Sequence, residues 1–387
     1  MKILQLVSDW KWTGPAEPML VLSAALRARG HQVDLVCPEP PGRANRSLWQ
    51  EACLRGFDPI ESIDRGRSAW HRGDFERVAR LGDWLGSEEL GGPYDIVHCW
   101  HSRDHVLAAR ALGLGGPFRR SGRRARLIRS LSHADPIRGW PWNRWLFGPA
   151  CDGLICVSDA TTRMLHPWRR GRPVASTTGA IDFDALEVRR PASEVRRQLG
   201  LPAAAPLIGV VARMQPHRRF DLLLEALARV VLRHPDVRLL VLGRGTHSHE
   251  VVEIPAQALG LAEHVLLPGY RVDDYSDLLS AADLFTFLVP GSDGTCRALL
   301  QAAALGLPMV GTRRGAIPEI ISNGQTGMLV EERPEALAAA WNALIEDPAR
   351  RRAMGEAARR DARERFQPDR HASWVERFYE EVRAGPV

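Results

Sequence analysis

A short stretch in the last third of the chain has the residue types of an anion-binding site. Residues 292–310, SDGTCRALLQAAALGLPMV, predict a loop, a helix and a strand in that order. Gly294 frees the backbone just before Thr295, a residue type that often caps a helix N-terminus. Such a loop suits phosphate or another anion, because the first amides of the helix point toward it. The charged and amide side chains of this stretch are Asp293, Arg297 and Gln301.

Two arginines follow another predicted strand, in the segment VARMQPHRRFDLLLEAL. Arg213 lies just past the strand, and Arg218 comes five residues later, before a helix. Two guanidinium groups at the carboxyl edge of a strand can hold a diphosphate by forked hydrogen bonds, and the alternative is that both are solvated loop residues. Gly243 and Gly245 in LGRG allow a ligand to approach the backbone closely, although a plain turn explains them equally well.

Three histidines follow or end a strand in the first half of the chain, in DIVHCWHSRDH. His98 or His101 at the end of this strand could orient a hydroxyl group, and the alternative is a histidine satisfied within the packing. The spacing of His98, His101 and His105 also allows a metal site, but no carboxylate or cysteine completes a convincing set of ligands.

Strands and helices alternate along the chain, and this alternation predicts the elements that position these residues. The 387 residues suffice for two domains, each with a doubly wound parallel sheet. We expect an N-terminal Rossmann-like domain over 1–183, a polar and Pro/Ala-rich linker over 184–205 and a C-terminal Rossmann-like domain over 206–365. A last amphipathic helix over 366–387 is expected to pack back on the N-terminal domain. Ligands of such sheets bind outside the carboxyl ends of the strands, so we expect a cleft between the two domains.

The composition favours a cytoplasmic protein that is soluble or peripheral on a membrane. No apolar run approaches the roughly 18 residues of a membrane span, the N-terminus is too short for a signal peptide, and the six cysteines form no C-x-x-C pair. Lys+Arg exceeds Asp+Glu by 52 − 46 = 6, with arginine clusters at 118–129 and 166–173. These clusters could attract anionic lipid head groups, and a solvated basic face is the alternative. No nucleic-acid module is recognisable, so we expect no nucleic acid as a partner.

The order of these segments resembles the retaining nucleotide-sugar glycosyltransferases of glycosyltransferase family 4, which have a GT-B fold. The family's second domain has a G-R-L-V-P-E-K-G opening, a glycine turn, an aaD segment, an E-G-F-G-x-x-x-L-E-A-x-A-x-G-x-P-V-V stretch and a G-G-x-x-E turn. The corresponding segments here, in the same order, are ARMQPHRRFDLLLEA, LGRG, SAADLF, SDGTCRALLQAAALGLPMV and GAIPEII. The resemblance covers nearly the whole chain and implies an α/β architecture of two Rossmann-like domains facing across a cleft.

The resemblance also implies roles for individual residues of the second domain. Arg213 matches the family's diphosphate-binding arginine, and Arg218 stands where the family has a lysine. Asp293 and Gln301 fall on two family glutamates, of which the first contacts the donor sugar and the second holds the ribose hydroxyls. Backbone amides of the helix start are expected to face the donor phosphates, with the glycines of LGRG and Gly294 nearby; the residues concerned are Gly243, Gly245, Gly294, Thr295, Cys296 and Arg297.

In the first domain, the segment SDWKWTGPAEPML stands where the family has a glycine-rich loop that closes over the donor phosphate. Gly14 matches one of its glycines, while Pro15 replaces the other and removes a backbone donor. His98 matches the first histidine of the family's d-i-v-H-x-H segment, Trp100 falls on the second, and His101 is next in line to reach the cleft. In CVSDATTRML, Ser158 is expected to cap the following helix.

The resemblance implies a retaining, metal-independent glycosyltransferase of bacterial cell-surface polysaccharide or lipopolysaccharide biosynthesis, without a cofactor. It would move a sugar from a UDP- or GDP-sugar to a saccharide or glycolipid hydroxyl, and a glycolipid acceptor would bring it to the inner face of the cytoplasmic membrane. The expected catalytic residues are Asp293, His98 and His101. Two alternatives stay open: a non-catalytic nucleotide-sugar-binding scaffold of the same fold and a GT-B nucleotide-sugar epimerase.

Overall fold

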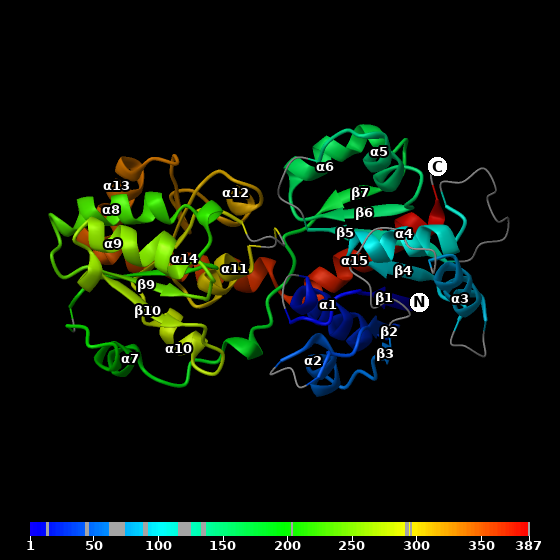
Figure 1. Cartoon of the computed structure of the whole chain (residues 1–387), viewed down its shortest axis with the longest axis horizontal. Coiled ribbons are helices and arrows are strands. Elements are labelled where there is room, and N and C mark those ends of the chain that lie inside the picture. The colour runs from blue at the N-terminus through cyan, green and yellow to red at the C-terminus, as the bar shows by residue number, and fades with distance from the viewer. Residues whose placement is uncertain are drawn as a thin grey trace. The chain divides into compact units, whose positions relative to one another are not determined.

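The chain forms two compact units, seen in a computed structural model (Figure 1). Unit 1 comprises Met1–Ala180, Ser292–Thr295 and Pro368–Val387, and unit 2 comprises Ile181–Gly291 and Cys296–Gln367. The structure describes residues 1–12, 15–42, 46–61, 74–87, 92–114, 125–132, 137–202, 204–290, 294 and 296–385.

Unit 1 is built on a seven-stranded parallel sheet with the strand order β3-β2-β1-β4-β5-β6-β7. Its strands are β1 (Lys2–Leu6), β2 (Gln32–Cys37), β3 (Ile60–Glu61), β4 (Ile96–Cys99), β5 (Arg126–Leu131), β6 (Gly153–Cys156) and β7 (Val174–Ser176). Its helices are α1 (Ala16–Ala28), α2 (Leu48–Leu54), α3 (Asp74–Gly86), α4 (Ser102–Ala111), α5 (Pro141–Phe147), α6 (Asp159–Leu165), the 3-10 turn η1 (His166–Trp168) and α15 (Pro368–Ala384).

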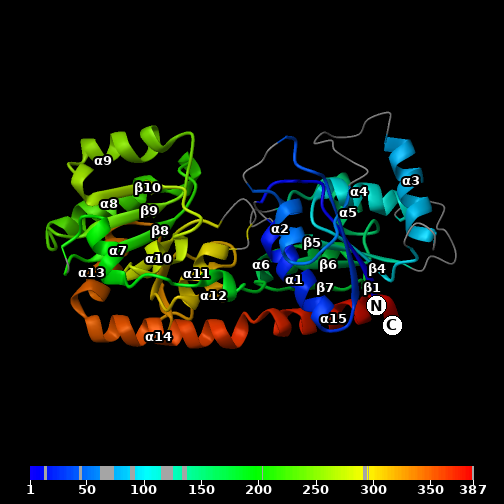
Figure 2. The same cartoon turned by 90° about the horizontal axis from the view of Figure 1, so that it is seen from below.

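Two hydrophobic clusters cover the two faces of this sheet, as expected for parallel strands buried on both sides. Alternate residues of β1 divide between them: Ile3 packs in the cluster that holds α1 and α15, whereas Leu4 and Leu6 pack in the one that holds α3 and α4. Helix α15 lies alongside α1 (Figure 2). It also covers the start of β6, where a Cβ on Gly153 would lie 2.6 Å from Val382, so this glycine permits the close packing.

Unit 2 is built on a six-stranded parallel sheet with the order β10-β9-β8-β11-β12-β13. Its strands are β8 (Leu207–Val211), β9 (Arg238–Leu242), β10 (Val265–Gly269), β11 (Leu284–Phe287), β12 (Met309–Gly311) and β13 (Gly327–Leu329). Its longer helices are α7 (Ala192–Gln198), α8 (Phe220–Val231), α11 (Arg297–Ala304), α13 (Pro334–Glu346) and α14 (Pro348–Arg365). Its shorter helical segments are η2 (Asp184–Leu186), η3 (Pro216–Arg218), η4 (His249–Glu253), α9 (Ile254–Ala258), η5 (Ala262–His264), α10 (Tyr275–Ser280) and α12 (Ile317–Ile320).

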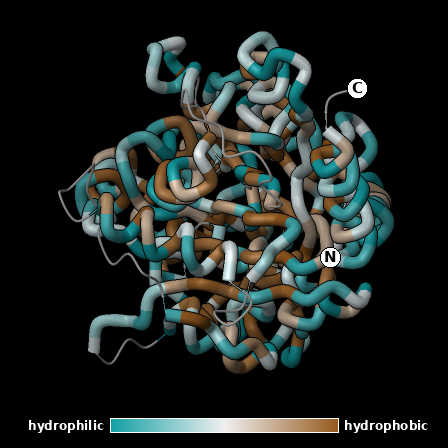
Figure 3. The backbone as a smooth tube through the Cα atoms, turned by 90° about the vertical axis from the view of Figure 1, so that its right-hand side faces the viewer, coloured by the Kyte–Doolittle hydropathy of each residue, from teal (hydrophilic) through white to brown (hydrophobic). Residues whose placement is uncertain are grey.

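The unit 2 sheet has the same two-sided core. Leu207 of β8 packs in a cluster with residues of α10, α11 and α14, and Ile208 packs in the opposite one with residues of α8 and α13. Hydrophobic segments lie toward the middle of the view in Figure 3 and hydrophilic segments around its rim.

The segment 184–205, which we expected to be a linker, contains η2 and α7. Arg196 of α7 ties it to unit 2 by donating to Asp283 Oδ2 at 2.5 Å. Within the described part of the chain, no helix is both long and apolar enough to cross a bilayer.

Candidate functional site

The strand order of unit 2 reverses between β8 and β11, and this reversal marks the place where doubly wound sheets bind ligands. The chain runs from β8 outward through β9 to β10, then returns to β11 on the other side of β8. Loops leaving β8 and β11 therefore diverge at the carboxyl edge of the sheet. Arg213 lies in the loop after β8, and Cys296 ends the loop after β11.

The two helices that follow these strands begin with the same unusual backbone geometry. Arg219 precedes α8 with φ 60°, and Cys296 precedes α11 with φ 50°. A left-handed conformation costs energy for any residue with a Cβ, and such residues gather where function requires a fixed backbone. Neither N-cap side chain accepts a hydrogen bond from the amides of its helix. The first turns of α8 and α11 thus begin at the switch point, each after an N-cap residue with left-handed backbone.

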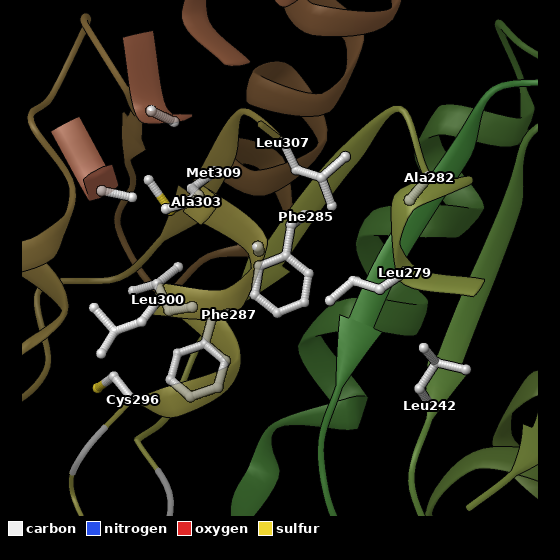
Figure 4. Packing of buried hydrophobic residues seen from close by; sticks show 14 of the residues in the cluster. Leu242, Leu279, Ala282, Phe285, Phe287, Cys296, Leu300, Ala303, Leu307 and Met309 are labelled. Atoms are coloured by element: carbon white, nitrogen blue, oxygen red, sulfur yellow. The ribbon is translucent and has the colours of Figure 1, made fainter. Parts of the chain in front are cut away.

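The predicted anion-binding loop begins its helix one residue later than we expected. Helix α11 has Cys296, rather than Thr295, at its N-cap position, and Gly294 has the positive φ of 64° that only glycine adopts easily. Cys296 is buried in the same hydrophobic cluster as Phe287 of β11, which Figure 4 shows close by, so its side chain faces the core rather than solvent. The predicted residues Gly14, Asp293 and Thr295 lie outside the described residues.

Gly243 and Gly245 have a packing reason for being glycine. A Cβ on Gly243 would lie 2.1 Å from the carbonyl oxygen of Ala212, and one on Gly245 would lie 2.3 Å from that of Met214. The loop after β9 therefore packs directly against the loop after β8. The Ala212 amide of the β8 loop also donates a hydrogen bond to the Leu242 carbonyl at the end of β9, at 3.1 Å. This contact places both glycines beside Arg213, which is exposed.

Arg218, which follows β8, connects the loop after β8 with the loop after β11. Its side chain is buried, and Nη1 donates to the carbonyl oxygens of Val289 at 3.2 Å and Pro290 at 2.5 Å. These carbonyls begin the loop that ends at Cys296. The guanidinium group therefore positions the β11 loop, a role that the comparison with the family's lysine did not predict.

Gln301 lies in the second turn of α11 and is half-buried. Its Oε1 accepts a hydrogen bond from the Tyr275 hydroxyl of α10 at 2.8 Å. Sequence reasoning missed Tyr275, because it starts an ordinary-looking helical segment with no motif around it. Only the fold brings it next to Gln301.

In unit 1, His98 is fully buried inside β4. One ring nitrogen, Nδ1, lies 2.7 Å from the Tyr379 hydroxyl of α15, and Nε2 lies 2.8 Å from Ser130 Oγ of β5. Burial, followed by the positive charges of Arg129 and His371, lowers the pKa of His98 to about 3. A neutral histidine with both nitrogens engaged by protein groups favours the packing alternative over contact with a substrate.

His101 differs from His98 because it lies at the switch point of the unit 1 sheet, between β1 and β4. It is the N-cap residue of α4, and its Nδ1 lies 3.6 Å from Asp104 Oδ2. The same carboxylate oxygen accepts from the Ser8 amide at 3.1 Å, in the loop after β1. His105 is buried, with Nε2 3.0 Å from the Ala150 carbonyl oxygen. Among the residues that the structure describes, no group of three or more His, Cys, Asp or Glu could hold a metal ion.

The arginine cluster at 166–173 is only partly a surface feature. Arg169 is buried, and its guanidinium donates to backbone carbonyls that include those of Phe147 at 2.6 Å and Asp152 at 2.8 Å. Arg170 is exposed. Of the other cluster, residues 118–124 lie outside the described part, and Arg129 is buried in β5.

Comparisons with known proteins identify the family of this chain. The profile of the family described as Glycosyltransferase Family 4 matches residues 17–177, and that of Glycosyl transferases group 1 matches residues 192–361. N-acetyl-alpha-D-glucosaminyl L-malate synthase of Bacillus anthracis is 28% identical over 93% of this chain and 92% of its own length. A GDP-mannose-dependent alpha-(1-6)-phosphatidylinositol monomannoside mannosyltransferase of Mycolicibacterium smegmatis is 30% identical over 72% of this chain and 75% of its own length.

A solved structure supports the same conclusion about the fold. HepE of Anabaena, crystallised with UDP, superimposes with a TM-score of 0.78 over 98% of this chain and 100% of that one, at 19% sequence identity. The predicted resemblance and the two Rossmann-like sheets are therefore confirmed. The chain is a glycosyltransferase of family 4 with the GT-B fold.

Proposed function

We propose that this glycosyltransferase moves a sugar from a nucleotide diphosphate sugar to a hydroxyl group of a saccharide or glycolipid, with retention of the anomeric configuration. The observation that carries the proposal is that Arg213 and the α11 N-terminus belong to the two loops that leave β8 and β11 at the switch point of the unit 2 sheet, with Gln301 in the second turn of α11. These groups suit a diphosphate and a ribose in their chemical type.

The charge that develops on the departing diphosphate explains why these groups suit catalysis. The exposed guanidinium of Arg213 can form forked hydrogen bonds with phosphate oxygens, and the positive end of the α11 dipole favours the same anion. Such fixed donors stabilise developing charge without reorganising. We assign this neutralisation to the chain's own groups, with no metal ion and no cofactor.

Retention follows when the acceptor attacks from the side on which the diphosphate leaves. The bond between the anomeric carbon and the phosphate oxygen breaks, the acceptor oxygen bonds to the same carbon, and the hydroxyl proton passes to the leaving phosphate. We assign the positioning of the donor sugar to Asp293 on its sequence match. We assign the orientation of the acceptor hydroxyl to His101 on its place at the unit 1 switch point.

The donor base is either uracil or guanine. The Mycolicibacterium relative is named for GDP-mannose, and the Anabaena structure contains UDP, so the proposal covers UDP- and GDP-sugars alike. A role in bacterial cell-surface polysaccharide or lipopolysaccharide biosynthesis is supported by the phosphatidylinositol-linked acceptor in that relative's name.

An acceptor in a membrane also fits the surface around α5. Trp140 and Trp142 are 62% and 48% exposed, and Arg138 lies over the Trp140 ring, 5.9 Å from its centroid. Arg144 and Arg163 are exposed as well. Tryptophan and arginine together suit the interface of an anionic bilayer. We therefore place the chain in the cytoplasm, peripheral on the inner face of the cytoplasmic membrane.

Vesicle flotation tests the membrane part of the proposal. The wild type should float with vesicles that contain phosphatidylglycerol and not with pure phosphatidylcholine, and a Trp140→Ser/Trp142→Ser variant should lose this binding. A Leu54→Ser/Leu232→Ser variant removes two exposed apolar side chains elsewhere and should bind like the wild type. Equal binding by all three proteins would rule out α5 as the membrane contact.

Product analysis with a panel of UDP- and GDP-sugars and bacterial lipid and saccharide extracts tests the transferase itself. Release of UDP or GDP together with an α-linked product from an α-linked donor is the expected result. Binding without turnover would instead favour the scaffold alternative, and an altered nucleotide sugar without any acceptor would favour the epimerase.

A further inference from the structure

The hydrogen bond between Tyr275 and Gln301 joins two elements that approach the candidate site from different directions. Tyr275 is the first residue of α10, which follows β10 at one edge of the sheet, whereas Gln301 belongs to α11, which follows β11. The Tyr275 hydroxyl donates to Gln301 Oε1 at 2.8 Å. Both side chains are half-buried, so the bond is partly shielded from water.

Ion pairs hold the start of α10 in place. Asp274, directly before Tyr275, accepts from Arg271 at 2.5 Å and from Arg190 at 3.2 Å. Asp277, which is 3% exposed, accepts from the Arg190 guanidinium at 2.9 Å and from the Arg189 amide at 2.7 Å. The Tyr275 ring thus projects from an anchored helix turn, and its hydroxyl is a fixed donor rather than a mobile one.

The tyrosine decides how the Gln301 carboxamide faces the site. A carboxamide has an acceptor oxygen and a donor NH2 group, which are not interchangeable. Because Tyr275 donates to Oε1, the oxygen is held toward α10 and the Nε2 group points away from that bond. Among the described residues, the hydrogen bond that the Gln301 side chain makes is the one from the Tyr275 hydroxyl to Oε1. Nε2 is therefore the group that Gln301 can present to a ligand.

We propose that Tyr275 is a positioning residue that orients Gln301 so that Nε2 donates a hydrogen bond to a ribose hydroxyl oxygen of the bound nucleotide. The inference rests on the proposed function, because it assumes a nucleoside diphosphate in this site. In addition, the inference means that this chain binds the ribose through a neutral tyrosine–glutamine pair. The Gln301 amide donates the hydrogen bond and the ribose hydroxyl oxygen accepts it. Tyr275 itself does not touch the nucleotide.

Calorimetric titration with matched nucleotides tests this role. The probes are UDP and GDP, and for whichever of them binds, its 2′,3′-dideoxy analogue, which lacks both ribose hydroxyls. We expect Tyr275→Phe to lower the affinity for the ribonucleotide about threefold to tenfold, as the loss of one positioned hydrogen bond would. The affinity for the dideoxy analogue should change less than twofold. On a Gln301→Ala background, Tyr275→Phe should have no further effect on either nucleotide.

The matched control is Tyr270→Phe, which removes a hydroxyl from a 52% exposed tyrosine of the same unit. It should bind both nucleotides like the wild type. If Tyr275→Phe weakens the dideoxy analogue as much as the ribonucleotide, Tyr275 only supports the fold and the inference is overturned. If the wild type binds the ribonucleotide and its dideoxy analogue equally, the ribose is not read at this site. If the wild type binds neither UDP nor GDP, the proposed function itself fails, and the inference fails with it.

Discussion

The two sheets of this chain share a topology but differ in what lies at their switch points. In unit 1, buried side chains bond across the switch point between β1 and β4: Trp100, directly after β4, donates from Nε1 to Gln5 Oε1 of β1 at 2.7 Å. His98 beside them is bonded to α15 and β5. In unit 2, the corresponding edge has an exposed arginine and two N-cap residues with left-handed backbone, whereas the N-cap residues of α1 and α4 in unit 1 have negative φ.

The difference indicates that one topology serves two purposes in the same molecule. The buried network of unit 1 joins strands and helix α15 and leaves His101 at the edge. The edge of unit 2 presents positive charge and backbone amides. There the backbone at Arg219 and Cys296 is left-handed, a conformation that costs free energy. The predictions below test this contrast, beginning with the largest effect.

Mild acid should destabilise unit 1 more than unit 2. Burial lowers the pKa of His98 and His105 to about 3 and that of His371 to about 4, and all three belong to unit 1. The unfolded chain takes up protons on these residues near pH 6.5 and the folded unit does not, so their contribution to stability is full above that pH and falls as the pH drops toward 3 to 4. Between pH 7 and pH 5, each of these histidines should lower the free energy of unfolding of unit 1 by about 2 kcal/mol.

Hydrogen exchange read separately on peptides of the two units, at pH 7 and pH 5 with correction for the intrinsic rates, measures this effect. A His98→Gln variant is the control, because it removes one of the three groups and should reduce the pH dependence. Equal loss of protection in both units would contradict the contrast.

Adding a methyl group to the β9 loop should disturb the unit 2 edge strongly. Gly245→Ala would place a Cβ 2.3 Å from the Met214 carbonyl oxygen, which forces the β8 and β9 loops apart. We expect a loss of about 2 to 3 kcal/mol in the free energy of unfolding, together with weaker nucleotide binding. Gly86→Ala is the control, because Gly86 also lacks a positive φ but has open space around it, so the added methyl group meets no clash. If both variants have the same free energy of unfolding and the same nucleotide affinity, the contact between the β8 and β9 loops does not support the site.

Removing the exposed guanidinium should weaken binding without loss of stability. Arg213→Ala is expected to lower the affinity for UDP or GDP at least tenfold, since a charged hydrogen bond contributes about 1.5 to 3 kcal/mol. The matched control is Arg233→Ala, because Arg233 is also exposed but follows the opposite end of α8. Calorimetry on the two variants measures the difference, and equal affinities would remove the diphosphate role from Arg213.

The smallest effect concerns a helix cap of unit 1. Ser158 Oγ accepts from the Thr161 amide at 3.3 Å and caps α6, as we predicted from the sequence. Ser158→Ala should cost about 1 kcal/mol of stability and leave nucleotide affinity unchanged. Chemical denaturation and calorimetry together measure both values. A change in nucleotide affinity would mean that side-chain caps in unit 1 also serve the ligand.

The sequence predicted the elements better than the contacts between them. Period and composition located strands such as β1 and β8, and the motifs located Arg213 after β8 and Gln301 on the helix after β11. They could not show that His98 meets Tyr379, because the two are 281 residues apart and the packing of α15 decides the contact. The contacts of Arg218 with the β11 loop and of Tyr275 with Gln301 could likewise not be predicted, since the direction of a side chain depends on the loop or helix that carries it.

A crystal structure with UDP or GDP bound tests the central claim most directly. The account predicts the diphosphate at the carboxyl edge between β8 and β11, within hydrogen-bond distance of the Arg213 guanidinium and the first amides of α11. A diphosphate bound elsewhere, with Arg213 in bulk solvent, would contradict it.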